Sequence, residues 1–260
     1  LENGIVGFEF GEYDKNKELV IDPLIYSTYI GSLSTESSSD IKVNSNGEAY
    51  ITGGTHYFGF PTTTGAYNNN GNGMNSGNAT SNANLISDVI VTKINASGSG
   101  LIYSTFIGGA EDDYGTAIDI DNSGNAYITG FTNHSIIPLT PNFPTTIGCF
   151  NSTKTGIFQS TFVTKLNSTG TALVYSTYLW GLNMNNNSTE IKVDNSGNAF
   201  VLGTFALTPI NNIPTGTTYY GGTTNCKTYQ VQLNNTGTGL NYSHLIDGKC
   251  IGLAVVNNNV

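Results

Sequence analysis

Apolar and polar residues alternate over short stretches of this chain, and each stretch ends at a cluster of Asn, Ser and Gly. The clearest case is IDIDNSGNAYITG, Ile118–Gly130, where Ile-Asp-Ile-Asp leads into Asn-Ser-Gly-Asn and then into Ala-Tyr-Ile-Thr-Gly. Alternation with a period of two predicts a strand with one buried face, and Asn and Gly tolerate the left-handed backbone of a tight turn. The stretch therefore predicts a β-hairpin.

The same hairpin is repeated along the chain. IKVNSNGEAYITG (Ile41–Gly53) and IKVDNSGNAFVLG (Ile191–Gly203) repeat it at intervals of about 75 residues. Two further elements recur, a strand–turn–strand stretch such as Asp88–Gly109 and the shorter FPTTTGAY, Phe60–Tyr67. Each unit thus predicts four short strands, a to d, with a Pro- and Thr-rich excursion between b and c. A sustained 3.6-residue period is absent, so we expect little or no helix.

A repeated four-stranded antiparallel sheet fits either a β-propeller blade or a stacked β-solenoid. The excursions differ in length, and insertions are tolerated at blade rims but would interrupt a solenoid. The predicted fold is therefore all-β, a β-propeller-like array of four-stranded antiparallel blades with about three full blades plus partial ones.

Several of these motifs resemble a known family. LVYSTYLWG (Leu173–Gly181), DNSGNAYITG (Asp121–Gly130), FPTT (Phe143–Thr146) and VTKLN (Val163–Asn167) are similar to the SBBP-type β-propeller repeat of secreted and cell-surface proteins. The resemblance runs from about Ile21 to the C-terminus. It implies a propeller fold and an extracellular or cell-surface location, and it carries over no catalytic residues.

The expected organisation follows the repeat. Residues 1–23 are predicted to form a β-hairpin segment that leads into β-propeller-type repeats over 24–260. The units lie at approximately 24–100, 101–172 and 173–239, with a partial unit at 240–260.

Each end of the repeat array contains a partial blade. A d-type strand is expected at Leu24–Ile30, and strand a of a fourth blade at Ile251–Val256. We predict that the edge at 251–256 is paired, either by further sequence or by another subunit, because an apolar sheet edge invites pairing.

Composition narrows the function. The net charge is −9, the pI is about 4.5, and all nine cationic residues are lysines. Nucleic acid is excluded as a partner because no basic stripe exists to neutralise phosphates. The sequence has no apolar run long enough for a membrane-spanning helix. Low charge and abundant hydroxyl side chains suit an extracellular protein.

Candidate catalytic and metal-binding residues are weak, and we predict no enzyme, no cofactor and no metal. The three histidines, His56, His134 and His244, fall at unrelated places in the repeat, although His56 and His134 could converge on one rim. The chain has no arginine for a sialidase-type site and no common catalytic motif.

Two acidic stretches are candidate cation sites. Asp119 and Asp121 imitate the first positions of an EF-hand loop, but the final glutamate is missing, so a plain turn is the better interpretation. The run Glu111–Asp113 could hold a hard cation but is more often solvated.

Aromatic residues divide into two groups. Those in strand d are expected to pack between blades: Tyr26, Tyr29, Tyr103, Tyr175 and Tyr178. Those in the excursions are expected to be exposed and able to bind a ligand: Tyr57, Phe58, Phe60, Tyr219 and Tyr220.

Cysteines and sequons give two modification predictions. Folding of the third c–d hairpin predicts a Cys226–Cys250 disulfide, while Cys149 reads as a small buried side chain. Sequons are no more frequent than composition implies, but three share one position, where strand c enters its turn: Asn95, Asn167 and Asn234. Glycans are predicted there first if the host glycosylates, and the other sequons are Asn78, Asn133, Asn151, Asn186, Asn187 and Asn241.

The sequence favours a non-catalytic structural or adhesive module of a secreted or cell-surface protein that works in an extracellular assembly. Its expected partners are other subunits or further blades, and glycans. The alternative is a carbohydrate-binding or carbohydrate-active β-propeller that uses the Thr- and Tyr-rich loops.

Overall fold

The structure is a computed structural model, which describes residues 26–33, 35–56, 59–71, 86–133, 142–153, 159–181, 186–205, 217–220, 226–248 and 252–255. These residues form thirteen β-strands in three sheets and no helix. The all-β, blade-like prediction is confirmed. The described residues do not close a ring.

The first two sheets each hold four antiparallel strands in chain order. The first sheet consists of β1 (Glu36–Val43), β2 (Ala49–Thr55), β3 (Asp88–Ile94) and β4 (Leu101–Ile107). The second sheet consists of β5 (Asp113–Ile120), β6 (Ala126–Thr132), β7 (Ser160–Leu166) and β8 (Leu173–Gly181).

The third sheet has the same four strands and one more. Its a to d strands are β9 (Asn186–Val193), β10 (Ala199–Phe205), β12 (Cys226–Leu233) and β13 (Leu240–Asp247). The fifth strand, β11 (Thr218–Tyr220), pairs in parallel with the outer edge of β13. In every sheet strand d pairs with the strand c that precedes it in the sequence. The repeat units expected from the sequence each begin with a strand d, so each sheet starts one strand later than the corresponding unit.

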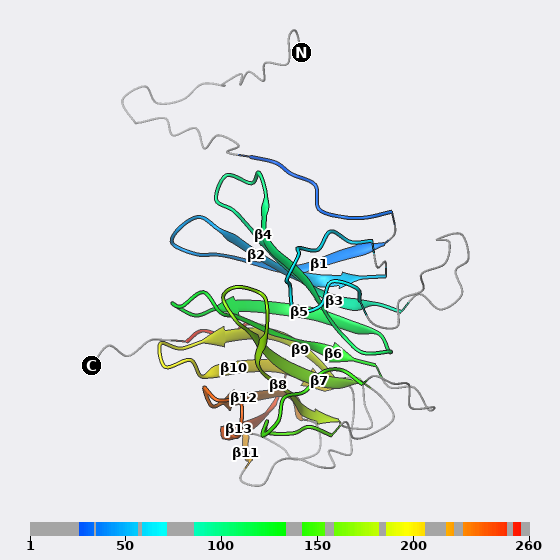
Figure 1. Cartoon of the computed structure of the whole chain (residues 1–260). Coiled ribbons are helices and arrows are strands. Elements are labelled where there is room, and N and C mark those ends of the chain that lie inside the picture. Colours follow the sequence, from blue (N-terminus) through cyan, green and yellow to red (C-terminus); the bar gives the residue numbers. More distant parts are fainter. Residues whose placement is uncertain are drawn as a thin grey trace, which may run out of the picture.

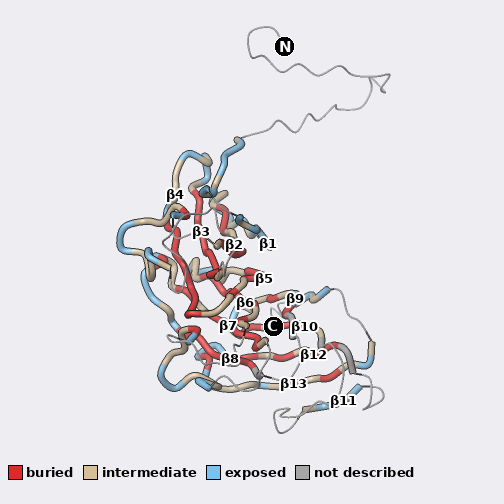
Figure 2. Tube along the Cα trace, turned by 90° about the vertical axis from the view of Figure 1, so that its right-hand side faces the viewer, coloured by how far each residue is buried: buried red, intermediate tan, exposed pale blue. Residues whose placement is uncertain are grey.

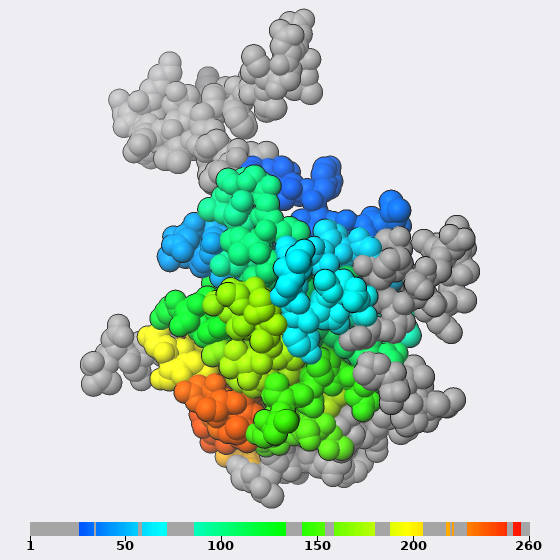
Figure 3. Space-filling view, viewed as in Figure 1, coloured from blue at the N-terminus to red at the C-terminus, as the bar shows by residue number. Residues whose placement is uncertain are grey.

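The sheets stack face to face in chain order (Figure 1). Strand a of one sheet lies against the sheet before it: β5 contacts β1 and β2, and β9 contacts β5 and β6. The space-filling view shows the same order, from the blue and cyan first sheet at one end to the orange of β12 and β13 at the other (Figure 3). We call the face of a sheet toward the N-terminal end of this stack its near face, and the opposite face its far face.

Two apolar layers fill the spaces between the sheets. Between the first and second sheets, Val91 and Tyr103 of the far face pack with Ile118 and Ile128 of the next near face. Between the second and third sheets the equivalent layer includes Tyr127, Val163, Tyr175, Ile191, Val201 and Tyr229. Burying such side chains contributes about 1.5–3 kcal/mol each, so these layers hold the stack together.

The excursions cover the outer edge of strand d. In the first sheet the Thr63 amide donates to the Ser104 carbonyl oxygen at 3.1 Å, and the Phe106 amide donates to the Asn68 carbonyl at 2.9 Å. The FPTT copy of the second sheet makes the same bonds between Thr146 and Ser176 and between Tyr178 and Asn151. An outer edge bonded in this way no longer offers free backbone groups to another chain.

Both expected partial strands are corrected. The described residues 26–30 and 252–255 are not strands. The physical reason is pairing: the described residues place no neighbouring strand beside either segment, and a strand is stable only in a ladder of backbone hydrogen bonds. The predicted hairpin over 1–23 lies outside the described residues.

Candidate functional site

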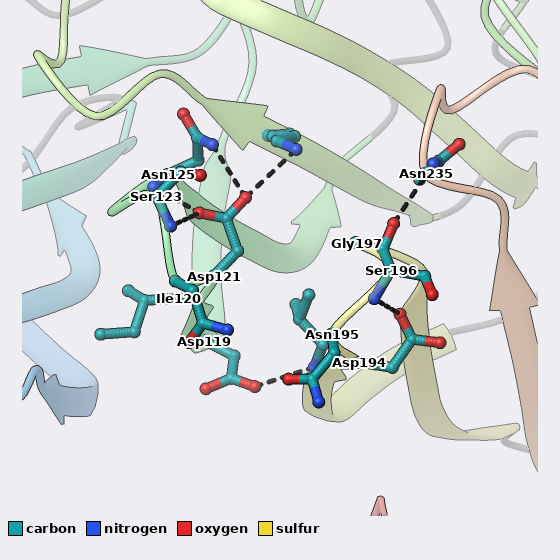
Figure 4. A pocket seen from close by; sticks show the side chains of 13 residues that line it. Asp119, Ile120, Asp121, Ser123, Asn125, Asp194, Asn195, Ser196, Gly197 and Asn235 are labelled. Carbon is teal, nitrogen blue, oxygen red and sulfur yellow. Dashed lines mark hydrogen bonds and ion pairs between the residues drawn. The ribbon is translucent and has the colours of Figure 1, made fainter. Parts of the chain in front are cut away.

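A polar hollow lies between the a–b turns of the second and third sheets (Figure 4). We call it the turn pocket. One wall is the turn after β5 and the other is the turn after β9, and its lining includes Asp119, Asp121, Asn122, Lys165, Asp194, Asn195 and Asn235.

Both carboxylate oxygens of Asp121 accept hydrogen bonds from residues of its own hairpin. Its Oδ1 accepts the amides of Ser123 at 3.0 Å and Asn125 at 2.9 Å, and its Oδ2 accepts the Asn125 side-chain amide at 2.8 Å and the Tyr127 hydroxyl at 3.2 Å. Lys165 Nζ lies 3.3 Å from the same oxygen. Burial acts to raise the pKa of Asp121, but the hydrogen bonds from Asn125 and the Lys165 charge outweigh it, so that the pKa is lowered. This carboxylate therefore stays ionised and holds the hairpin.

Asp119 and Asp194 also bind the backbone. Asp194 Oδ1 accepts the amides of Ser196 and Asn198, each at 2.9 Å, as Asp121 does in the preceding sheet. Asp119 Oδ2 accepts the Val193 amide at 2.8 Å, across the sheet interface. Burial raises the pKa of Asp119, and the Val193 hydrogen bond only partly offsets this.

Within the part of the chain that the structure describes, no group of three or more His, Cys, Asp or Glu side chains could hold a metal ion. The EF-hand-like residues instead form a turn, with Gly124 at φ 79°. The plain-turn interpretation is confirmed. What the pocket presents to solvent is the exposed amides and hydroxyls of Asn122, Ser123, Asn195 and Ser196.

The acidic run Glu111–Asp113 is not a solvated loop, and that expectation is corrected for Asp113. This residue is fully buried, and its Oδ2 accepts the Gly109 amide at 2.6 Å. Glu36 makes the equivalent bond in the first sheet, where its Oε1 accepts the Ser32 amide at 2.9 Å. The acid thus closes the loop between strand d of one sheet and strand a of the next.

The histidines are not brought together among the described residues. His56 Nε2 lies 3.3 Å from the Tyr114 hydroxyl, at the first sheet interface. His244 lies in β13, as expected of an ordinary strand residue, and stacks on Tyr242 with ring centroids 4.5 Å apart. His134 lies outside the described residues.

The strand-d tyrosines largely follow the prediction. Tyr103, Tyr175 and Tyr178 are buried between sheets, and Tyr26 is half-buried, but Tyr29 is fully exposed. Tyr29 lies in the segment beside which the described residues place no strand.

The excursion aromatics give a mixed result. Phe60 was expected to be exposed, but it is buried against Ile90 and Phe106, whereas Tyr220 is exposed. The side chains of Tyr57, Phe58 and Tyr219 lie outside the described residues.

The structure describes only some of the cysteines on which the predictions rest. Cys149 is a free thiol and is half-buried rather than buried as expected. Cys226 lies opposite Asp247 in the β12–β13 ladder. The Cys226 side chain and Cys250 lie outside the described residues, and the disulfide stays a prediction.

The shared sequons hold their turns. Each side-chain amide nitrogen donates to a hydroxyl four residues ahead: Asn95 to Ser99 at 3.1 Å, Asn167 to Thr171 at 3.0 Å and Asn234 to Thr238 at 3.2 Å. All three are half-buried rather than exposed. Turn geometry therefore accounts for these asparagines, and their glycosylation stays a prediction.

The remaining sequons differ in exposure. Asn241 is exposed, and Asn133 and Asn151 are half-buried. Asn78 and the side chains of Asn186 and Asn187 lie outside the described residues.

The sequence analysis missed a trio of side chains that contacts the next sheet. In the second sheet Lys165 lies 4.6 Å from the centre of the Tyr127 ring and pairs with Asp121, and the Tyr127 hydroxyl reaches the Gly197 carbonyl of the third sheet at 3.3 Å. In the first sheet the trio is Lys93, Tyr50 and Glu48, with Lys93 Nζ 2.7 Å from Glu48 Oε2. The signal was present, because Lys and Tyr recur together at fixed repeat positions.

Comparison with known proteins agrees with the geometry. No curated protein matches the chain. Residues 102–138 match the family model described as the SBBP β-propeller repeat. The match begins in β4 and runs through β5 and β6, so it spans the junction between the first and second sheets. The described residues contain no helix long and apolar enough to cross a membrane. Residues 102–138 of this chain are therefore similar to the SBBP β-propeller repeat.

Proposed function

We propose that this chain is a non-catalytic structural or adhesive module of a secreted or cell-surface protein and works as part of an extracellular assembly. The observation that carries the proposal is that acidic side chains of strand a accept backbone amides of the next strand-a position. Asp40 Oδ2 accepts the Ile118 amide at 3.0 Å, and Asp119 Oδ2 accepts the Val193 amide at 2.8 Å. Glu190 Oε2 accepts the Leu253 amide at 2.5 Å.

These bonds all join one strand-a position to the next. Carboxyl oxygens that accept backbone amides make strong hydrogen bonds, and here they join each sheet to the segment that follows it rather than face a substrate. A sequence with 10% charged residues and abundant Ser and Thr also suits an exterior location. Both features support a scaffold that presents surfaces to other molecules.

The proposal is tested on cells that produce the protein. Antibodies against the purified chain should label intact, unpermeabilised cells or the culture medium, and the chain should release no product from a panel of polysaccharides and glycosides. Labelling only after permeabilisation contradicts the location, and turnover of any panel member contradicts the non-catalytic role.

A second candidate function, carbohydrate binding, is favoured by the exposed amides and hydroxyls at the turn pocket. Such groups suit a neutral, hydroxyl-rich ligand. A glycan array tests it with Asn122→Ala/Asn195→Ala as the matched variant: binding that this variant loses supports the candidate, and binding that it keeps contradicts the assignment to the pocket.

A further inference from the structure

The near face of the first sheet is exposed where the other two near faces are buried. Ile118 and Ile191, at the same repeat position, are 0% exposed, whereas Ile41 is 54% exposed. Val43 is 60% exposed. Figure 2 shows the contrast between equivalent strands: β1 is drawn largely in exposed and intermediate colours, and β5 in buried and intermediate colours. A face with this apolar pattern resembles an interface without its partner.

Segment 26–30 occupies the position of one strand of a preceding blade. Tyr26 occupies the repeat position of Tyr103 and Tyr175, and all three rings cover a turn glycine of the following sheet. A Cβ built on Gly98 would lie 2.1 Å from Tyr26, and one on Gly170 would lie 2.4 Å from Tyr103. Ile30 packs against the Phe60 and Ile90 cluster of the near face. The segment 26–30 therefore lies on the first sheet where strand d of a preceding blade would lie.

The positions of the inner strands of that blade are not filled among the described residues. A hollow lies between segment 26–30 and the near face, lined by Tyr26, Ile30, Ile41, Ile51 and Ile90 among others.

The a–b turns also differ between the first sheet and the other two. A Cβ on Gly124 or Gly197 would lie 3.3 or 3.2 Å from the hydroxyl of Tyr50 or Tyr127 in the sheet before it. The equivalent Gly47 has a positive φ of 80°, and among the described residues it meets only Ala96 of its own sheet within 4 Å. The described part of the chain thus places no tyrosine of a preceding strand b against this turn.

We propose that the near face of the first sheet, together with segment 26–30, is a docking site for the three inner strands of a further SBBP-type blade. Strand c of that partner adds to segment 26–30 and converts it into strand d, and its far face covers Ile41 and Val43. By repeat equivalence the partner presents a tyrosine from strand b to Gly47. This inference rests on the proposed role as a module in a larger assembly and names the partner at one face of it.

Hydroxyl-radical footprinting tests the proposal without any substitution. The oxidation of Ile41 and Val43 is compared between the assembly on producing cells and the purified 260-residue chain at low concentration. Because burial removes a half-exposed side chain from solvent, oxidation at both positions should fall about tenfold in the assembly. Ile147, which is fully exposed on an excursion, is the internal control and should not change.

Two results overturn the proposal. Equal oxidation of Ile41 and Val43 in both samples would show that nothing docks there. Protection already present in the dilute purified chain would show that the chain's own remaining residues cover the face. Neither result affects cell labelling or the absence of turnover, so the proposed function is judged separately.

A photo-crosslinking residue at position 43 then identifies the partner. The expected crosslinked peptide carries an SBBP-type strand a, b or c, from a second copy of this chain or from another stretch of repeat, which isotope-labelled copies distinguish. Crosslinks to lipid, glycan or a protein without such a repeat would contradict the assignment of the partner.

Discussion

The two ends of the sheet stack have different chemistry at the same repeat positions. The near face of the first sheet exposes Ile41 and Val43 and keeps the apolar pattern of the two buried near faces. The far face of the third sheet departs from its sisters: Gln230, Gln232 and His244 stand where the second sheet has Val163, Lys165 and Thr177. The comparison teaches that one end keeps a blade-docking pattern and the other has lost part of it.

The third sheet has also lost the trio that contacts the next turn. Phe200 and Gln232 replace the tyrosine and lysine, so neither a hydroxyl nor a cation is presented there. In their place the aromatic rings contact one another, with Phe200 and Tyr242 6.3 Å apart, and Gln230 reaches the Tyr242 hydroxyl at 3.5 Å. Paired changes of this kind are typical of repeats that meet a different environment.

The largest expected effect compares equivalent isoleucines. Ile118→Ala should lower the free energy of unfolding by about 2–5 kcal/mol, because it leaves a cavity in the first interface. Ile41→Ala in the purified chain should change it by less than about 0.5 kcal/mol, because the side chain is half-exposed. Urea denaturation measures both, and equal costs would contradict the difference between the two near faces.

The tyrosine-covered glycines come next. Gly170→Ala should cost about 1–3 kcal/mol more than Gly65→Ala, because both have positive φ but only Gly170 has a tyrosine ring against it. Gly98→Ala should fall between them, because Tyr26 lies on an unpaired segment that can shift. Thermal and urea unfolding of the three variants provide the measurement, and a Gly98→Ala cost as large as that of Gly170→Ala would show that segment 26–30 is already rigid.

A smaller effect is expected for the lysine of the trio. Lys165→Gln should destabilise the chain by about 1–2 kcal/mol, because it removes a largely buried charge from beside Asp121. The reciprocal Gln232→Lys should change stability by no more than about 0.5 kcal/mol, because the far face of the third sheet offers it only a surface ion pair. A large gain from Gln232→Lys would mean that the trio stabilises a sheet by itself.

The smallest expected effect concerns the loss of folding stability at low pH. Because the pKa of Asp121 is lowered in the folded chain, its contribution is present above the ordinary value of 3.8 and is lost as the pH falls through the lowered pKa. Asp121→Asn should therefore reduce the acid-induced loss of stability by less than about 1 kcal/mol. Urea denaturation of Asp121→Asn and of the unchanged chain, at neutral pH and at steps below pH 4, measures this effect, and equal acid-induced losses of stability in the two would contradict the lowered pKa of Asp121.

The local sequence pattern predicted the sheets because the residues of each hairpin specify its strands and its turn. The alternation at Ile118–Asp121 and the glycine at 124 specify strand, turn and strand without reference to distant residues. The turn interpretation of Asp119 and Asp121 and the interface burial of Tyr103 and Tyr175 were reached in the same way. Burial of Phe60 and Asp113 was not predicted, because each depends on which segment covers it.

The sequence by itself determined the four-strand unit, its repetition and its all-β class, since these follow from periodicity and turn chemistry within about 75 residues. Only the tertiary structure decided whether a copy of the unit is buried, paired or open. Ile41 and Ile118 have the same motif around them, and segment 26–30 (YSTYI) differs by one residue from the strand-d stretch 103–107 (YSTFI). A side chain is buried only when another sheet lies on it, and a strand forms only when another strand bonds to it, so the neighbour rather than the motif sets the outcome.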